Sequence, residues 1–292
     1  MAMQLEFSKL HGCGNDFVFV NDMTDELTLT DDQVKLLCHR QFGIGADGVI
    51  VVKPPQNPEN HGFMHYINAD ATLAQMCGNG VRCFAKYLVD YGIVEPGTPE
   101  LRIETRAGVK TITYVTDNSG KLAAATVDMG APILDPEAVP TTFKPTSMDE
   151  YGEAYAREIP LESPFGTFEF TCISMGNPHA ITFVEDVDTV DLDAIGAFFE
   201  SHPAFPEKTN VEFAQVTDQG IRMRVYERGC GETLACGTGA CATNVAAYLT
   251  GRTGNENDLL LRGGTLHIDY HPGSEVMMTG PAVESFRGTI TV

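Results

Sequence analysis

Hydrophobic and polar residues alternate over short stretches along most of the chain, a pattern typical of β-strands with one buried face. In the N-terminal part this pattern predicts strands at 5–10, 17–22, 49–52, 63–68, 101–105 and 109–116, the last two forming a hairpin. Further on it predicts strands at 165–174, 180–186, 210–216, 221–229, 258–262, 265–271 and 275–280. So many short, closely spaced strands indicate mainly antiparallel sheets.

Helices are fewer, and we expect them at 31–40, 79–91, 191–200 and 238–250. Thr30 and Gln33 form a capping box that opens the first helix. Gly92 and Gly251 are suitable C-terminal residues for the second and fourth. The helix at 238–250 is small or apolar almost all round, which is typical of a helix buried on every side. We therefore expect it to be enclosed by a curled antiparallel sheet.

The order of elements occurs once in each half of the chain: strands, a helix, strands, and a helix that follows a Cys-Gly motif. The spacing repeats too, because Cys236 follows Cys77 by 159 residues and Asn177 follows Asn15 by 162. Glu227 follows Asn68, again by 159 residues. We interpret this as a duplication, with the least regular stretch, from 116–120 through 132–164, as the boundary region.

Composition limits the classes of function. A chain of 292 residues is long enough for two domains, and its formal net charge of -21 argues against binding nucleic acid or an anionic membrane. No apolar run approaches the roughly 18 to 20 residues of a membrane span, and the N-terminus has no signal-peptide pattern. We therefore expect a cytoplasmic protein whose eight cysteines are mostly reduced.

Two motifs carry the candidate chemistry: Cys-Gly-Asn-Gly at 77–80 and Cys-Gly-Thr-Gly at 236–239. One interpretation is a pair of tight turns with small buried cysteines. The other is a pair of reactive thiols, because a helix N-terminus lowers a thiol pKa and glycines let a carboxylate approach the backbone. Two thiols beside one carboxylate suit racemisation or epimerisation: one removes a proton from the neighbouring carbon and the other donates one on the opposite face.

Polar residues at predicted strand ends complete a candidate amino-acid pocket. Any one amide is more often a turn residue or cap, but the shared placement at strand ends, near the cleft that we expect between the two halves, favours ligand contact. These residues are Asn15, Asn68, Asn177, His179, Asn210, Glu227 and Arg228.

Other chemistries lack their motifs. The chain has no Cys-x-x-Cys, no His-Glu-x-x-His, no Cys/His spacing for zinc, no dinucleotide fingerprint and no phosphate loop. We therefore expect no metal. The remaining cysteines are interpreted as structural: Cys13, Cys38, Cys83, Cys172, Cys230 and Cys241.

Several blocks, in order and over almost the whole chain, resemble the diaminopimelate epimerase family: KLHGCGNDFVFVND, CGNGVRCFAKYL, MGNPHAITFVEDVD, TNVEFAQV, RVYERGCGETLACGTGACA and MTGPA. The resemblance implies a cofactor-independent interconversion of LL- and meso-diaminopimelate in lysine and cell-wall synthesis. It also implies an α+β fold of two pseudo-symmetric domains, each a mainly antiparallel, barrel-like sheet around a central helix. The site would lie in the cleft between them, with closure on the substrate and a homodimer. We expect the domains at 1–125 with about 282–292, carrying Cys77, and at 126–281, carrying Cys236.

Residue roles also follow from the resemblance. It implies that Cys77 and Cys236 are the acid/base thiols, which oxidation could join as an inactivating disulfide, and that His179 and Glu227 assist at the reacting centre. The cradle there would be Gly78, Asn79, Gly237 and Thr238. The substrate-binding set would be Asn15, Asn68, Asn177, Asn210, Glu227 and Arg228.

Three positions depart from the family pattern. Ala71-Thr72 follows Asp70 where the family commonly has Gly-Ser, Gly48 stands where some members have a substrate-contacting glutamine, and Phe286 stands where some have a tyrosine linked to dimer contacts.

Two alternatives remain open. One is another two-cysteine racemase, acting on proline, hydroxyproline or a different amino acid, and the other is a non-catalytic binding protein on the same scaffold. The Asn/Glu/Arg set favours a substrate with a second polar end, and a mere binding protein would not need both cysteines.

Overall fold

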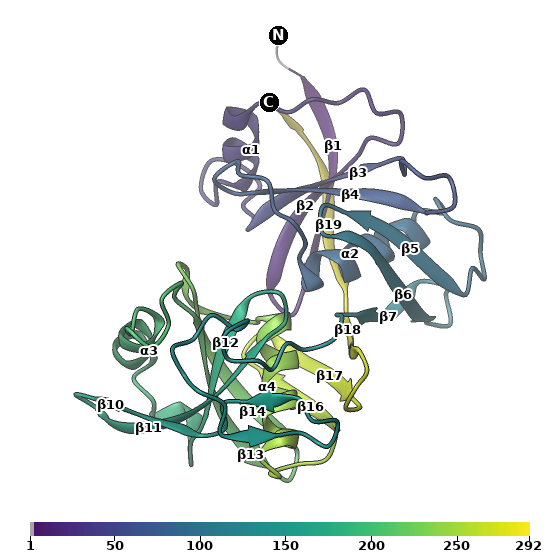
Figure 1. Cartoon of the computed structure of the whole chain (residues 1–292). Coiled ribbons are helices and arrows are strands. Elements are labelled where there is room, and N and C mark those ends of the chain that lie inside the picture. Colours follow the sequence, from purple (N-terminus) through teal and green to yellow (C-terminus); the bar gives the residue numbers. More distant parts are fainter. Residues whose placement is uncertain (1–2) are drawn as a thin grey trace. The chain divides into compact units, whose positions relative to one another are not determined.

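The structure, a computed structural model, describes residues 3–292 and divides into two compact units (Figure 1). Unit 1 comprises Met1–Val127 and Thr279–Val292, and unit 2 comprises Asp128–Met278. The C-terminal segment belongs to unit 1 because its strand β19 (Val283–Thr291) pairs antiparallel with β1 (Gln4–Gly12).

Unit 1 is a mainly antiparallel sheet with two parallel contacts. Strand β19 pairs with β1 and β1 with β2, both antiparallel; β2–β3 and β4–β5 are parallel, and β3–β4, β5–β6 and β6–β7 are antiparallel. The further elements are β2 (Asn15–Asn21), α1 (Asp31–Cys38), β3 (Gly48–Lys53), β4 (Gly62–Asn68), α2 (Gly78–Asp90), β5 (Glu100–Thr105), β6 (Gly108–Thr116) and β7 (Leu122–Asp128).

The two helices of unit 1 follow their local signals. Thr30 Oγ1 accepts from Gln33 N at 3.3 Å and Gln33 Oε1 accepts from Thr30 N at 2.9 Å, so the predicted capping box of α1 is confirmed. The helix ends at Cys38, earlier than predicted, because His39 is extended. Helix α2 is buried from Gly78 to Leu88 and contacts β1 to β5, which makes it the core of the unit.

Unit 2 repeats this arrangement. Pairs β10–β11, β11–β12, β13–β14, β14–β15 and β16–β17 are antiparallel, and β12–β13 and β14–β16 are parallel. Its strands are β8 (Ser147–Met148), β9 (Ala154–Tyr155), β10 (Ile159–Ser163), β11 (Gly166–Ser174), β12 (Pro178–Phe183), β13 (Asn210–Thr217), β14 (Gly220–Glu227), β15 (Gly231–Thr233), β16 (Glu256–Leu261) and β17 (Gly264–Tyr270), and β18 (Val276–Pro281) begins in unit 2 and ends in unit 1. Its helices are η1 (Val187–Thr189), α3 (Leu192–Glu200) and α4 (Gly237–Leu249).

The duplication is visible in the strand register. Phe17 pairs with Gly48 in the parallel β2–β3 contact, and His179 pairs with Asn210 in β12–β13, each partner 162 residues further on. Helices α2 and α4 follow the equivalent strands β4 and β14. As predicted, α4 is buried almost all round and contacts β11 to β14, β16 and β17. The predicted α+β class with mainly antiparallel sheets is confirmed.

Among residues 3–292, six strands were not predicted, namely β7 to β10, β15 and β19, and the alternation is weak in the three longest of them. Strand β7 is rich in alanine, β10 contains Pro160 and pairs only with β11, and β19 is exposed or half-buried throughout. Proline is tolerated on such an edge strand, where its missing N–H breaks no ladder bond. The stretch taken as an irregular boundary therefore contains β7 and the short strands β8 to β10.

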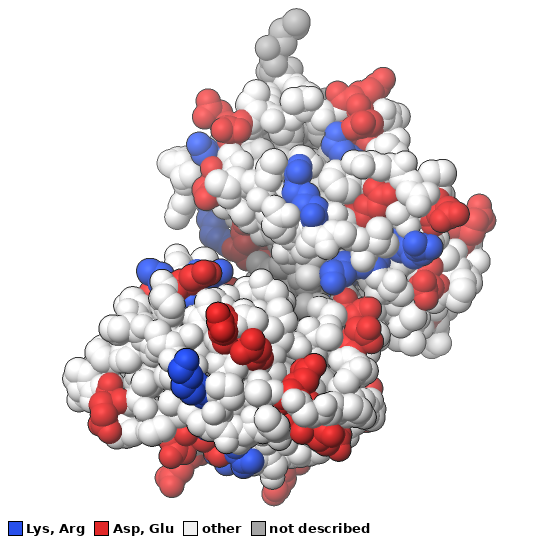
Figure 2. All heavy atoms as spheres, viewed as in Figure 1, with Lys and Arg blue, Asp and Glu red and all other residues white. Residues whose placement is uncertain are grey.

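The surface is strongly acidic. Figure 2 shows Asp and Glu side chains over the visible face of both units, with Lys and Arg between them, in keeping with a formal net charge of -21. Among residues 3–292, no helix is long and apolar enough to cross a membrane.

Candidate active site

Cys77 and Cys236 occupy equivalent positions, as the N-cap residues of α2 and α4. Both have extended backbones, and the helices begin at the next residues, Gly78 and Gly237. The unpaired N–H groups and positive dipole end of each helix therefore lie beside a thiol. Cys77 is half-buried, whereas Cys236 is only 6% exposed.

Around Cys77 the structure brings together two of the predicted amides. The Cys77 thiol donates to Asn15 Oδ1 at 3.4 Å, and Asn79 Nδ2 donates to the same oxygen at 3.4 Å. Arg82, fully buried, donates to Asn79 Oδ1 at 2.8 Å, and Asn15 Nδ2 donates to Asp47 Oδ2 at 2.7 Å. These contacts form a series of hydrogen bonds with Arg82 at one end and Asp47 at the other. Because Arg82 only donates and a carboxylate only accepts, the two ends fix the orientations of the Asn15 and Asn79 amides.

Asn68 lies at the end of β4, but its side chain is held by a local turn and not by the hydrogen bonds around Cys77. Its Nδ2 donates to Thr72 Oγ1 at 3.0 Å, and Asp70 Oδ1 accepts from the N and Oγ1 of Thr72. The turn places Ala71 at φ 73°, the left-handed region where glycine is favoured.

Gly48 has no room for a side chain. A Cβ there would lie 2.5 Å from Tyr66 Cε2 and 2.6 Å from the carbonyl oxygen of Ile67. A glutamine at this position would require the neighbouring strand to shift.

Cys236 lies in a different environment. Its sulfur accepts from Gly239 N at 3.4 Å and lies 3.4 Å from Thr238 Oγ1. Burial, together with the charges of Glu227 and Glu212, raises the pKa of the Cys236 thiol well above its ordinary value. The expectation that the helix N-terminus lowers the pKa of this thiol is therefore wrong, because desolvation and two nearby carboxylates outweigh the helix N–H groups.

Below Cys236, two predicted residues, His179 and Asn177, contact each other, and His179 also contacts Glu212, which the sequence analysis missed. His179, fully buried, lies with Nε2 3.1 Å from Asn177 Oδ1 and Nδ1 2.6 Å from Glu212 Oε1. Glu212 is also fully buried. The ring of His179 is thus held from both of its nitrogen atoms.

The remaining predicted residues of unit 2 form a second connected set. Asn210 Nδ2 donates to the carbonyl oxygen of Pro178 at 2.8 Å, and its Oδ1 accepts from Arg228 N at 2.9 Å. Glu227 accepts from Thr233 Oγ1 at 2.5 Å. Asn210 therefore ties the end of β14 to the start of β12.

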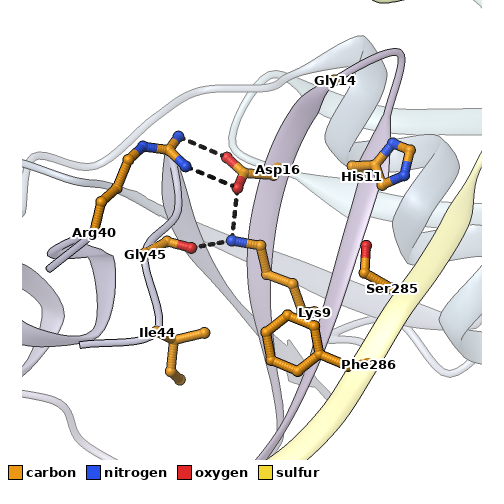
Figure 3. Close-up of a pocket in the computed structure, with 9 residues that line it drawn as sticks. All are labelled: Lys9, His11, Gly14, Asp16, Arg40, Ile44, Gly45, Ser285 and Phe286. Atoms are coloured by element: carbon orange, nitrogen blue, oxygen red, sulfur yellow. Dashed lines mark hydrogen bonds and ion pairs between the residues drawn. The ribbon is translucent and has the colours of Figure 1, made fainter. Parts of the chain in front are cut away.

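A pocket of about 370 Å³ opens beside the start of β2 in unit 1 (Figure 3). Asp16 lies between Arg40 and Lys9 there, with Arg40 Nη2 2.9 Å from Asp16 Oδ1 and Lys9 Nζ 2.6 Å from Asp16 Oδ2. Arg40 also binds Asp47 Oδ1 at 2.7 Å, which connects this pocket to Asn15. The pocket is lined by Lys9, His11, Gly14, Asp16, Arg40, Ile44, Gly45, Ser285 and Phe286.

Glu212, Arg82 and Asp47 were missed for the same reason: each is a charged residue inside or beside an element identified from its apolar pattern. Glu212 follows Asn210 by two residues in one strand, and residues so spaced share a face. That spacing was the available signal.

Of the cysteines interpreted as structural, Cys230 is exposed, so the interpretation as a packing residue is wrong for it. Cys13, Cys38, Cys83, Cys172 and Cys241 are buried.

The model of the diaminopimelate epimerase family matches residues 7–134 and 171–284 of the chain. The chain belongs to the diaminopimelate epimerase family. Similar curated members include a diaminopimelate epimerase of Leptospira biflexa, 41% identical over 99% of this chain and 100% of the relative. Another, from a Synechocystis species, is 48% identical over 98% of this chain and 99% of the relative. By family, the chain is an isomerase.

Solved structures of lower identity share the fold of this epimerase family. A hydroxyproline epimerase from Agrobacterium vitis, 16% identical, gives a TM-score of 0.67 over 99% of this chain and 91% of that one. A phenazine biosynthesis protein of the PhzF family from Bacillus anthracis, 16% identical, gives 0.69 over 99% and 100%. At this identity the likeness shows the fold alone.

Proposed function

We propose that the protein interconverts LL-2,6-diaminopimelate and meso-2,6-diaminopimelate without a cofactor, in the synthesis of lysine and peptidoglycan precursors. One observation carries the proposal: in a member of this family, two equivalent helices each begin at a cysteine N-cap followed by Gly-x-Gly. Equivalent thiols on equivalent helices are what a reaction at both faces of one carbon requires.

The proposed mechanism uses Cys77 and Cys236 as a two-base pair. One thiolate takes the proton from the α-carbon, so a C–H bond breaks and an S–H bond forms. The other thiol gives its proton to the opposite face, so its S–H bond breaks and a new C–H bond forms. The α-carboxylate lies against the N–H groups at 78–79 and 237–238, which stabilise the charge that develops on it.

Other side chains bind and orient the substrate in this proposal. His179 and Glu227 assist at the reacting centre, beside the cradle of Gly78, Asn79, Gly237 and Thr238. The amino and carboxylate groups of the distal end suit a set that has amides, a carboxylate and a guanidinium: Asn15, Asn68, Asn177, Asn210, Glu227 and Arg228. Both thiols must be reduced, which suits the cytoplasm. The working form in this proposal is a homodimer.

The direct test incubates the reduced protein with LL-diaminopimelate in heavy water and follows deuterium at the α-carbon together with formation of the meso isomer. We expect both without added cofactor. Absence of exchange sinks the proposal, and exchange of proline or hydroxyproline in its place supports a different racemase. Binding of diaminopimelate without exchange supports a binding protein.

Single cysteine variants test the two-base mechanism. Cys77→Ala and Cys236→Ala should each reduce epimerisation at least about a thousandfold, because each removes a group that handles a proton at one face. Cys230→Ala is the matched control, since Cys230 is exposed and has no part in the mechanism. A fully active Cys77 or Cys236 variant contradicts the mechanism.

A further inference from the structure

Glu212 is a carboxylate in the middle of a core, in strand β13 beneath the first turn of α4. Its Oε1 lies 2.6 Å from His179 Nδ1, and its Oε2 is buried with no hydrogen-bond partner. A buried carboxylate that is only partly paired is strongly unfavourable for folding. Packing alone therefore does not account for its presence.

Unit 1 shows that the fold does not require an acid at this place. By strand register, Phe17 and Ile50 are the unit 1 counterparts of His179 and Glu212. A Cβ at Gly80 would meet Ile50 Cδ1 at 3.2 Å and Phe17 Cζ at 3.5 Å. At the equivalent Gly239, by contrast, a Cβ would lie 2.6 Å from Glu212 Oε1. The space beneath the first helical turn is thus lined by apolar side chains below Cys77 and by ionisable side chains below Cys236.

The ionisable groups below Cys236 are close enough to act on its sulfur. A ring nitrogen of His179, a carboxylate oxygen of Glu212 and the sulfur of Cys236 all lie within 4.8 Å of one another. A negative charge at that distance in a buried site opposes loss of the thiol proton. The groups that face the sulfur come from four elements: His179 from β12, Glu212 from β13, Glu227 from β14 and Thr238 from α4.

We propose that Glu212 is a positioning residue, which fixes the His179 ring through Nδ1 and, together with burial and Glu227, favours the protonated form of the Cys236 sulfur in the free protein. This inference rests on the proposed function, because it makes Cys236 the acid and Cys77 the base when the free protein first meets substrate. Removal of the Glu212 charge should make Cys236 ionise more easily. It should also free the His179 ring to turn.

Cysteine alkylation tests this without substrate. Iodoacetamide is added to the folded, reduced protein from about pH 6 to about pH 10, and modified Cys236 is quantified by peptide mass spectrometry, because only the thiolate reacts. For the native chain we expect a midpoint well above the ordinary thiol value of about 8.5. Glu212→Gln should lower that midpoint and raise Cys236 alkylation at pH 8 at least about threefold. Glu212→Asp, which keeps the charge, should remain close to the native chain.

Glu104→Gln is the matched control, since Glu104 is another buried carboxylate, held by Asn60 in unit 1. It should leave Cys236 alkylation unchanged. A native midpoint at or below about 8.5, or a Glu212→Gln profile equal to the native one, overturns the inference. If Glu212→Gln does not fold, a native midpoint at or below about 8.5 still overturns the inference. Failure of deuterium exchange in the native chain would sink the proposed function but leave these profiles as they are.

Discussion

Asp47 fixes the orientation of Asn15: Asp47 Oδ2 accepts from Asn15 Nδ2 at 2.7 Å, so the carbonyl oxygen of Asn15 points to the Cys77 thiol. Asp47 is held in turn by Arg40, at 2.7 Å from its Oδ1. The amide that accepts from the Cys77 thiol is therefore oriented by the Asp47–Arg40 ion pair.

Asp47→Asn should weaken catalysis without unfolding the protein. An amide in place of the carboxylate can donate as well as accept, so Asn15 is free to turn its NH₂ group toward Cys77. Loss of a hydrogen bond to a charged group costs about 1.5–3 kcal/mol, which corresponds to a fall in kcat/KM of roughly tenfold or more. Steady-state epimerase kinetics measure it. Asp188→Asn, which removes an exposed ion pair with Arg222, should change kcat/KM little. Equal values for the two variants contradict the role of Asp47.

Replacing the second glycine of each Cys-Gly-x-Gly motif by alanine should destabilise the protein more at Gly239 than at Gly80. Gly239→Ala forces a Cβ to 2.6 Å from the buried carboxylate of Glu212 and to 3.3 Å from the Cys236 sulfur. We expect it to lower the free energy of unfolding by about 1–3 kcal/mol and to impair epimerisation. Gly80→Ala meets Ile50 Cδ1 at 3.2 Å, the flexible end of a side chain, and should cost less.

Denaturant unfolding of both variants, beside Gly254→Ala, tests this order. Gly254 has no heavy atom within 4 Å of an added Cβ and serves as the neutral control. If Gly239→Ala is as stable as Gly254→Ala, Glu212 does not occupy the space beneath α4 as described.

The course of the strands and helices was predictable because their signals are local. Alternation located β1 to β6, and the capping pair Thr30–Gln33 located α1. The glycines after α2 and α4 both adopt positive φ, at Gly92 and Gly251. These features depend on residues within a few positions of each other.

What the sequence did not predict depends on contacts between distant segments. Glu212 and His179 are 33 positions apart, and Asn15 and Asp47 are 32. The pKa of Cys236 was predicted to be lowered but is raised. A helix N-terminus can be recognised in the sequence, whereas burial and neighbouring carboxylates cannot. For charged residues inside apolar patterns, the contacts that decide their role are therefore known only from the structure.

Ala71→Gly should stabilise unit 1. Ala71 has φ 73°, where an L side chain costs about 1–2 kcal/mol relative to glycine. The greater freedom of glycine in the unfolded chain offsets part of this gain, so we expect the free energy of unfolding to rise by roughly 0.5–1 kcal/mol. Urea unfolding measures the change. Ala107→Gly, at a position without positive φ, is the control and should not stabilise. A loss of stability in Ala71→Gly shows that the turn is not strained.

Glu232 should contribute stability that depends on pH. Arg224 binds both of its carboxylate oxygens, at 2.9 and 3.1 Å, and with Arg262 lowers the pKa of Glu232 below its ordinary value. A carboxyl group with a lowered pKa in the folded state stabilises above its unfolded pKa, and this contribution is lost as the pH falls through the folded one. Glu232→Gln should therefore lower the free energy of unfolding by about 1–2 kcal/mol at pH 7. The difference in stability between the variant and the native chain should narrow below about pH 4.5. Thermal unfolding at several pH values, with Glu162→Gln as an exposed-strand control, measures the difference. A difference that stays constant from neutral to acidic pH contradicts the ion pair as its source.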